Sequence, residues 1–263
     1  MYKLKDKWAT HTSTGVVSKG IYIDREGNEL FVKGNSEVGY LEPFSETIAY
    51  KVAQFLNIQS LKYELAKASD FPDIKVYGDC NYVSVSPKLK YNLYQFYTLI
   101  DMNRELFKSN EDYLDIYLRL NLSKEHLLSM LYFDALIGNR DRHLNNFDIV
   151  RDKISGKFKN AIILDCGASI LYNMPEYKLK IYDGYKIGPN NSKPFKETHT
   201  RQIDYVRRKL RDTVYFVKPK GTFGDFYNYI IKEVNALPEL SSLRKDAMIS
   251  YLIQRYKFFI API

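Results

Sequence analysis

Residues Ile137–Val150 read IGNRDRHLNNFDIV, and this short stretch decides how the rest of the chain is interpreted. Asp141 and Asn146 are five residues apart, on a polar loop between a predicted helix and a predicted strand. Asp165 follows in the sequence LDCG, nineteen residues after Asn146 and at the end of the next predicted strand. A lone Asp-x4-Asn spacing is uninformative, because Asp and Asn cap turns and helices in most proteins. Its combination with a helix, a hairpin and Asp-Cys-Gly is much more specific.

Two carboxylates and one amide in this order suit the transfer of a phosphoryl group. One carboxylate must face the attacking hydroxyl and accept its proton, and Asp141 fits this role. A second carboxylate and an amide oxygen must hold Mg²⁺, which prefers hard oxygen ligands, and Asp165 and Asn146 fit that role. The Asp-x4-Asn spacing equals that of the protein-kinase catalytic loop, and Asp-Cys-Gly stands where Asp-Phe-Gly stands in that class. The sequence therefore predicts an enzyme that uses ATP and Mg²⁺.

Two upstream residues agree with this interpretation. Lys33 ends the predicted strand 29–33, and Glu46 lies in the first turn of a helix that is expected to begin near Pro43 and to end near Asn57. A strand lysine that binds the α- and β-phosphates and pairs with a helix glutamate is the usual companion of such a catalytic loop. We therefore predict an ion pair between Lys33 and Glu46 beside the nucleotide.

The segment 12–19 (TSTGVVSK) stands where a loop that covers the phosphates would lie, and Gly15 and Val17 are its predicted nucleotide contacts. It is no GxGxxG motif, because only Gly15 and Gly20 are available. Its backbone N–H groups and hydroxyls are nevertheless suited to bind phosphate. Its hydroxyl side chains are also candidates for self-phosphorylation: Thr12, Ser13, Thr14 and Ser18.

His143 is the second candidate catalytic residue, because it lies two residues after Asp141. It is expected either to contact a phosphate or to brace the catalytic loop through hydrogen bonds. Cys166 has no histidine near it in the sequence, so we expect it to pack behind Asp165 rather than to act as a nucleophile.

The order of predicted elements favours an α+β fold with two lobes, as in protein kinases: a small strand-rich N-lobe (1–88) and a larger helical C-lobe (89–263) that carries the catalytic loop and a metal-binding hairpin. The N-lobe is expected to contain one helix and a hairpin turned at 24–28. The remaining expected strands are 16–23, 29–33, 61–67, 81–86, 147–150 and one ending at Asp165, and the expected helices are 91–100, 111–120, 124–138 and several after 200.

Composition sets broad limits on the kind of protein. With 263 residues, 45% of them apolar, the chain can bury a sizeable core. Cys80 and Cys166 lie far apart without CxxC spacing, which argues against a disulfide framework or a zinc site. The first residues lack an apolar signal segment and no run is long enough to cross a bilayer, so we expect a cytoplasmic protein without a membrane span.

The net charge of +8 suits a polyanionic partner, and direct nucleic-acid binding stays open. Positive charge is densest in a predicted helix at 201–211 (RQIDYVRRKLR), where Ile203, Val206 and Leu210 would face the core. A solvated helix face and a docking surface for an acidic partner are both consistent with this pattern.

Four segments together resemble the HipA-like serine/threonine kinases of bacteria: 31–58 (FVKGNSEVGYLEPFSETIAYKVAQFLNI), 137–150 (IGNRDRHLNNFDIV), 164–170 (LDCGASI) and 191–203 (NSKPFKETHTRQI). The resemblance covers roughly residues 12–205. It implies that Asp141 is the catalytic base, that Asn146 and Asp165 bind Mg²⁺ and that Lys33 binds ATP. It also implies an adenine-binding hinge near Val85 and Ser86.

The long members of that family carry an additional amino-terminal domain, so this chain resembles a short form that consists of the kinase core. The family resemblance implies a phosphoacceptor protein and a small partner subunit such as an antitoxin, in a toxin–antitoxin pair. DRHxxN also resembles the phosphoinositide kinases, so a lipid or small-molecule acceptor is an alternative. A catalytically inactive binding module with a kinase fold is the other alternative.

Overall fold

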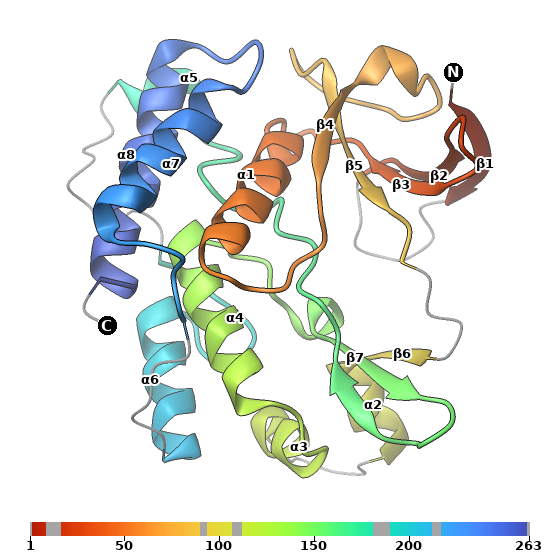
Figure 1. The fold of residues 1–263 in the computed structure, drawn as a ribbon, viewed down its shortest axis with the longest axis vertical. Coiled ribbons are helices and arrows are strands. Elements are labelled where there is room, and N and C mark those ends of the chain that lie inside the picture. Colours follow the sequence, from red (N-terminus) through yellow and green to blue (C-terminus); the bar gives the residue numbers. More distant parts are fainter. Residues whose placement is uncertain are drawn as a thin grey trace.

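The computed structural model describes residues 2–8, 17–89, 94–106, 112–180, 190–211 and 217–261, and Figure 1 shows their arrangement. A five-stranded sheet lies at one end of the molecule, and most helices lie at the other end and along one side. This is the predicted α+β architecture with a strand-rich N-lobe and a helical C-lobe. The division of the chain after residue 88 stays a prediction.

The N-lobe sheet has the strand order β1-β2-β3-β5-β4, with antiparallel neighbours throughout. Its strands are β1 (Lys3–Trp8), β2 (Lys19–Ile23), β3 (Glu29–Lys33), β4 (Glu64–Lys67) and β5 (Tyr82–Pro87), and a short 3₁₀ helix, η1 (Ala68–Asp70), follows β4. The predicted strands are confirmed within a few residues at their ends. β1 was not predicted from the sequence, and it adds an edge strand beside β2.

The hairpin between β2 and β3 forms for local reasons. The Asp24 carboxylate accepts hydrogen bonds from the backbone N–H groups of Glu26 and Asn28, at 2.9 and 2.8 Å. Gly27 adopts a φ of +84°, which a residue with a side chain rarely takes. This turn sets the register in which Lys19 of β2 stands opposite Lys33 of β3.

Helix α1 (Glu42–Phe55) connects the sheet to the helical lobe (Figure 1). Pro43 stands in its first turn, where the missing N–H has no helical partner to lose. The predicted apolar face is confirmed, since Ile48, Val52 and Ala53 are at most 1% exposed. Buried apolar side chains of this kind each contribute roughly 1.5–3 kcal/mol, so α1 is held chiefly by packing on both lobes.

A second, three-stranded sheet has the order β6-β7-β8 and consists of β6 (Tyr94–Thr98), β7 (Asp148–Asp152) and β8 (Phe158–Asn160). The prediction of a helix over 91–100 was wrong for Tyr94–Thr98, and residues 90–93 lie outside the described part of the chain. This aromatic segment pairs with β7 along its whole length, so tertiary pairing overrides the helical spacing. Helix α2 (Leu99–Leu106) begins only afterwards, where Thr98 and Asp101 exchange side-chain to backbone hydrogen bonds.

Helix α4 (Lys124–Ile137) is the central helix of the C-lobe and leads into the catalytic loop. Ser123 caps it as predicted, since its Oγ accepts from the His126 N–H at 3.1 Å. Gly138 ends it with a φ of +66°, and a Cβ at this position would lie 1.8 Å from the Tyr251 hydroxyl. Both the backbone angle and the close approach therefore require glycine here.

The C-lobe contains the other helices, two of which, α6 and α8, pack directly against α4. They are α3 (Tyr113–Arg119), η2 (Leu144–Asn146, a 3₁₀ turn), α5 (Glu176–Leu179), α6 (His199–Leu210), α7 (Phe223–Asn235) and α8 (Ser242–Phe259). In α6 the predicted core positions Ile203, Val206 and Leu210 are buried. No helix in the described ranges is both long and apolar enough to span a membrane.

The strand expected to end at Asp165 instead ends earlier, with β8 at Asn160. The following residues run beside the segment after α1, where Ile163 donates to the Gln59 carbonyl and accepts from the Leu61 N–H, at 3.2 and 2.8 Å. This bridge joins the two lobes directly upstream of Asp165.

Helix α7 strengthens the same connection between the lobes. Phe55 at the end of α1 packs edge-on against Phe226, with ring centroids 5.2 Å apart, and Lys51 lies 3.0 Å from Glu233. Because α1 is held against the C-lobe in this way, its polar residues keep a fixed position over the segment that carries Asp165.

Candidate active site

Lys33, Glu46 and Asp165 meet between the lobes. The Lys33 Nζ lies 2.5 Å from Oδ1 of Asp165 and 3.1 Å from Oε1 of Glu46. Lys33 is 7% exposed and Glu46 is fully buried. The predicted Lys33–Glu46 ion pair is therefore present, and one ammonium group joins the last residue of β3, α1 and the segment that follows β8.

Glu46 also fixes the residue after Asp165, because its second carboxylate oxygen accepts from the Cys166 N–H at 2.9 Å. Asp165 itself has a φ of +55°, a conformation that Asp tolerates better than most residues with a side chain. Its side chain keeps 34% of its surface exposed, so it contacts Lys33 and remains accessible to a ligand.

The charges of this cluster depend on one another. The Lys33 ammonium holds the pKa of Asp165 well below its usual range, which keeps this carboxylate ionised. Burial acts to lower the pKa of Lys33, but the charges of Asp165 and Glu46 outweigh it and raise this pKa. Burial raises the pKa of Glu46, while Lys33 and the Cys166 N–H oppose that shift.

Lys19 is a second lysine at this site, and the sequence alone predicted no role for it. It is the cross-strand partner of Lys33, and directly opposed residues in an antiparallel pair project to the same face of the sheet. Burial and the nearby Lys33 charge lower the pKa of Lys19, whereas Asp165, Glu42 and Glu46 act to raise it. The register of the predicted hairpin was the signal that could have identified Lys19.

The catalytic loop is held by a buried arginine. Arg142 is 1% exposed, and its guanidinium makes a bidentate pair with the fully buried Asp134 of α4, at 2.9 and 3.1 Å. Its Nη1 donates both to the Asn146 carbonyl at 3.1 Å and to the Leu164 carbonyl at 2.7 Å. One nitrogen thus places Asn146 next to the residue that precedes Asp165.

Asp141 and Asn146 are also positioned from within the loop. The Asp141 N–H donates to Oδ1 of Asn139 at 3.1 Å, and Asn139 donates to Asp134 at 2.9 Å. The Asn146 side-chain nitrogen donates to the Asp141 carbonyl at 3.0 Å. The carboxamide oxygen of Asn146 therefore points away from that carbonyl. His143 lies beside Asp141, with its Nε2 3.8 Å from Oδ2.

Lys193 was not predicted as a site residue, yet its Nζ lies 3.1 Å from Oδ1 of Asp141. Its segment is anchored by Phe195, whose N–H donates to Oε1 of the buried Gln202 at 2.9 Å. The Phe195 ring packs against Phe147, with centroids 6.0 Å apart. No spacing rule connects residues 141 and 193, so only the folded chain brings these two side chains together.

The other predicted nucleotide contacts belong to the segment before β2 and to β5. Gly15 and the hydroxyl residues 12–14 lie outside the described residues, and Val17 is buried just before β2. Val85 and Ser86 lie within β5, opposite Val32 and Phe31 of β3, and the chain leaves the sheet after Pro87. Their role as an adenine hinge stays a prediction.

Asp148 is a further acid near the metal-ligand candidates, and the sequence alone predicted no role for it. Burial raises its pKa to about 6, with Arg142 opposing and Asp165 and Asp101 contributing. Its charge state therefore responds to Asp165, since Asp148 begins β7 and Asp165 follows β8, at the open end of the same antiparallel hairpin.

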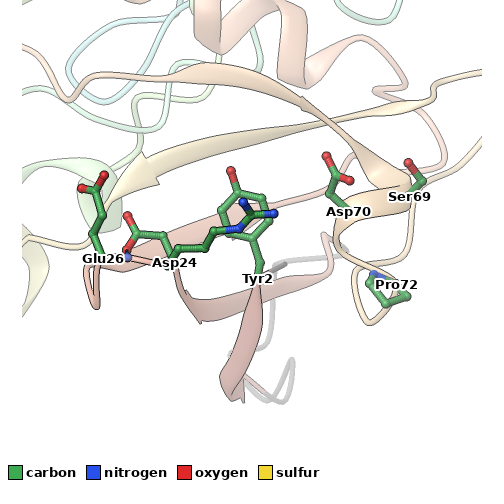
Figure 2. A pocket seen from close by; sticks show the side chains of 7 residues that line it. Tyr2, Asp24, Glu26, Ser69, Asp70 and Pro72 are labelled. Atoms are coloured by element: carbon green, nitrogen blue, oxygen red, sulfur yellow. Dashed lines mark hydrogen bonds between the residues drawn. The ribbon is translucent and has the colours of Figure 1, made fainter.

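A hollow of about 870 Å³ that includes no residue of the Lys33 cluster lies at the β2–β3 turn and the η1 segment (Figure 2). Figure 2 shows the Tyr2 ring in its middle, with the carboxylates of Asp24 and Glu26 on one side and that of Asp70 on the other. Three carboxylates disfavour a triphosphate. Because this hollow includes no residue of the Lys33 cluster, we do not assign it to the chemistry.

No protein-family model matches the sequence, and no curated protein matches it. Solved structures do match. The proinflammatory kinase CtkA of Helicobacter pylori is 14% identical, with 98% of this chain and 93% of that chain covered and a TM-score of 0.66. HipA of Shewanella oneidensis, solved with HipB and operator DNA, is 12% identical, with 98% and 72% covered and a TM-score of 0.51.

The chain therefore has the two-lobed kinase fold that HipA and CtkA share, and the predicted HipA-like fold is confirmed. These identities establish the fold alone. The protein is kinase-like, and the assignment of its reaction depends on the geometry of its own residues.

Proposed function

We propose that the protein transfers the γ-phosphoryl group of ATP to a hydroxyl group of an acceptor protein. The observation that carries this proposal is the contact of Lys33 with both Asp165 and Glu46, next to a loop in which Arg142 holds Asn146 beside Leu164. An inactive binding module would not need these groups to be held together, and most of them are buried and polar.

Lys33 and Lys19 would bind the phosphates of the nucleotide. Both project from the face of the β2–β3 hairpin that is turned toward Asp165, as their mutual electrostatic effects indicate. Two ammonium groups suit a polyphosphate, which carries several negative charges. Gly15 and Val17 would contact the phosphates from the preceding loop, and Val85 and Ser86 would contact the adenine.

The donor set fits Mg²⁺. Asp165 supplies an ionised, partly exposed carboxylate, and Asn146 supplies a carboxamide oxygen. Mg²⁺ commonly takes only one or two protein carboxylates or amides and completes its shell with phosphate oxygens and water. When bound, the ion would neutralise charge on the phosphates. Before nucleotide binding, the Lys33 ammonium balances the same Asp165 carboxylate.

Asp141 would orient the acceptor hydroxyl and accept its proton as the oxygen–phosphorus bond forms and the bond between the β- and γ-phosphates breaks, releasing ADP. The Lys193 ammonium, 3.1 Å from Asp141, would lie near the transferred group and offset its charge. His143 would brace the loop beside Asp141.

The acceptor that we propose is a serine or threonine of a protein. The side chain of Asp141 is 47% exposed, so a side chain presented by another protein can reach it. A small partner subunit is a second proposal, because HipA, which shares this fold, was solved in a complex with HipB. A test of that proposal is whether a co-purified protein alters the rate of phosphotransfer.

The test of the function is incubation with γ-labelled ATP and Mg²⁺, followed by mass spectrometry of the protein itself and of acceptor candidates. We expect phosphate incorporation in the native protein and in Asp204→Asn, which alters an exposed acid of α6. We expect the rate of incorporation to fall roughly 10³-fold in Asp165→Asn. Absence of both ATP binding and phosphate incorporation in the native protein would overturn the proposal.

A further inference from the structure

A small cavity of about 190 Å³ lies between the end of α4 and the segment that follows Asp165. Its walls include Arg140, Ser169, Tyr172, Lys178 and Tyr251. Two of its lining residues are cations and none is an acid. The lining of this cavity is therefore net positive, whereas the lining of the hollow in Figure 2, with three carboxylates and Arg25, is net negative.

Both cations have N–H donors that remain available for a ligand. Arg140 donates one hydrogen bond from Nη2 to Asn173 at 2.9 Å, and its guanidinium lies 5.4 Å from the centroid of the Tyr172 ring. A guanidinium has five N–H donors, so most of them remain for a ligand. Within the described ranges, neither Arg140 nor Lys178 forms an ion pair with a carboxylate.

Neutral donors complete the lining. The Tyr251 hydroxyl lies against Gly138, at the place that a Cβ would occupy. Burial raises the pKa of Tyr251, and the nearby Arg255 and Arg140 charges oppose this shift. The phenol is therefore protonated at neutral pH and can donate a hydrogen bond, and its response to Arg140 places the two side chains close together.

The walls of the cavity are held from both lobes. Ser45 of α1 donates to the Ser169 carbonyl at 2.9 Å, and the Leu41 N–H donates to the Tyr172 carbonyl at 3.3 Å. From the C-lobe, the buried Arg244 donates to the Met174 carbonyl at 2.6 Å. The cavity is thus preformed, and a ligand need not order the segment in order to bind.

We propose that this pocket binds a phosphate monoester group, and that its occupation regulates the neighbouring catalytic loop. Two cations and the hydroxyl donor of Tyr251 suit a dianion, and the planar fork of an arginine matches two phosphate oxygens. The volume is below the roughly 300 Å³ of the smallest usual pockets for whole ligands, which favours a single anionic group over a nucleotide.

The proposed regulation follows from the position of Arg140. It directly precedes Asp141, and its backbone N–H donates to the Ala168 carbonyl at 3.2 Å, in the segment after Asp165. A phosphate held by Arg140 and Lys178 would therefore tie the catalytic loop to this segment and to α5. This regulatory role depends on the proposed kinase function, whereas phosphate binding itself does not.

The test of binding uses inorganic phosphate and O-phosphoserine, titrated by calorimetry at low salt. We expect Arg140→Gln and Lys178→Gln each to weaken binding by about tenfold or more, as loss of a charge-assisted hydrogen bond should. Lys180→Gln, which removes an exposed lysine at the end of α5, should leave it unchanged. Asp141→Asn should also retain binding, so the result does not depend on catalysis.

Two results would overturn the assignment. One is equal affinity in the native protein and Arg140→Gln. The other is loss of binding in Lys33→Met but not in Arg140→Gln, because the anion would then occupy the nucleotide cleft. An inactive protein that binds phosphate through Arg140 would instead contradict the proposed function and leave the pocket assignment standing.

A phosphoryl group in this pocket can come from the chain itself or from an acceptor. If it comes from the chain, the chain's own phosphoryl group occupies the pocket after pre-incubation with ATP. Such protein should then bind O-phosphoserine more weakly than phosphatase-treated protein. If it comes from an acceptor, phosphatase-treated protein should phosphorylate intact casein faster than dephosphorylated casein, and Arg140→Gln should remove this preference. Either result supports the pocket, and the absence of both contradicts its regulatory role.

Discussion

The ammonium of Lys193 lies 3.1 Å from the carboxylate of Asp141, across 52 residues of sequence. Both side chains are about half exposed, so this pair adds little to stability, on the order of 0–1 kcal/mol. Its position beside the proposed base indicates a role in the reaction rather than in folding.

We predict that Lys193→Ala lowers the rate of phosphotransfer by about 10²-fold, in the range found when one preorganised charge donor is removed. Thermal stability should change by no more than a few degrees. The check is a single-turnover rate beside a melting curve, with Lys196→Ala as the control in the same segment. A faster rate in Lys193→Ala would show that the lysine blocks Asp141 instead of assisting it.

Asp141→Asn should leave nucleotide affinity nearly intact and lower phosphotransfer by about 10²–10⁴-fold. Nucleotide affinity is assigned to Lys33, Lys19 and the metal ligands, whereas Asp141 is assigned to the acceptor hydroxyl. Asparagine keeps the size of the side chain, and the backbone N–H bond to Asn139 should survive. The paired measurements are the dissociation constant of ATP and the rate of phosphate incorporation. Loss of both in a folded variant would move Asp141 to the nucleotide or metal site.

Asp165→Asn should abolish the dependence of turnover on Mg²⁺ and lower the rate roughly 10³-fold. The reason is that a bound metal stabilises the charge of the transition state by several kcal/mol. Asparagine is preferable to alanine at this position because it tolerates the φ of +55°. The check is a Mg²⁺ titration of the rate, with circular dichroism to verify the fold. An unchanged Mg²⁺ response would remove Asp165 from the metal site.

Arg142→Met should lower the free energy of unfolding by about 3–5 kcal/mol, because it leaves the fully buried Asp134 without its cation. The double variant Arg142→Met with Asp134→Leu should recover much of this stability, since both charges are then gone. Urea unfolding of the three proteins measures the effect. If the double variant is no more stable than Arg142→Met, the cost lies in the lost bonds to Asn146 and Leu164.

His199 should make the protein less stable in acid. It is 1% exposed, neither ring nitrogen has a hydrogen-bond partner among the described residues, and burial together with Arg255 lowers its pKa to about 3. The unfolded chain takes up a proton below about pH 6.5, whereas the folded chain does not, so stability falls as pH decreases from 6.5 toward 3.

Between pH 6.5 and 5 this single histidine should account for a loss of about 2 kcal/mol. His199→Phe should remove that part of the slope and keep the edge-on packing against Phe259. Urea unfolding at several pH values compares the two proteins. The same slope in both would mean that His199 is protonated in the folded state or is not the group responsible.

Where a structural feature depends on neighbouring residues in the sequence, the sequence predicted it. The hairpin turn at Asp24 and Gly27 and the caps of α4 at Ser123 and Gly138 are of this kind, since each uses hydrogen bonds or backbone angles within a few residues. The helical register of α1 likewise placed Glu46 on the side that faces Lys33.

Features that depend on long-range pairing were missed or mistaken. The segment of β6 was expected to be helical because residues 91–100 have helical spacing, and only the pairing with β7 makes it a strand. Lys19 lies opposite Lys33 through the strand register, and Arg142 is a buried brace although arginine usually lies at the surface.

The sequence by itself determined which chemical groups this protein has and the local elements on which they sit, because turns, caps and helix periods depend on short-range sterics and hydrogen bonds. Only the tertiary structure decided that Lys33 reaches Asp165, that Lys193 lies against Asp141 and that Arg140 and Lys178 share a cavity. The physical reason is that these contacts depend on the packing of the lobes, and no sequence spacing encodes distances between side chains from distant segments.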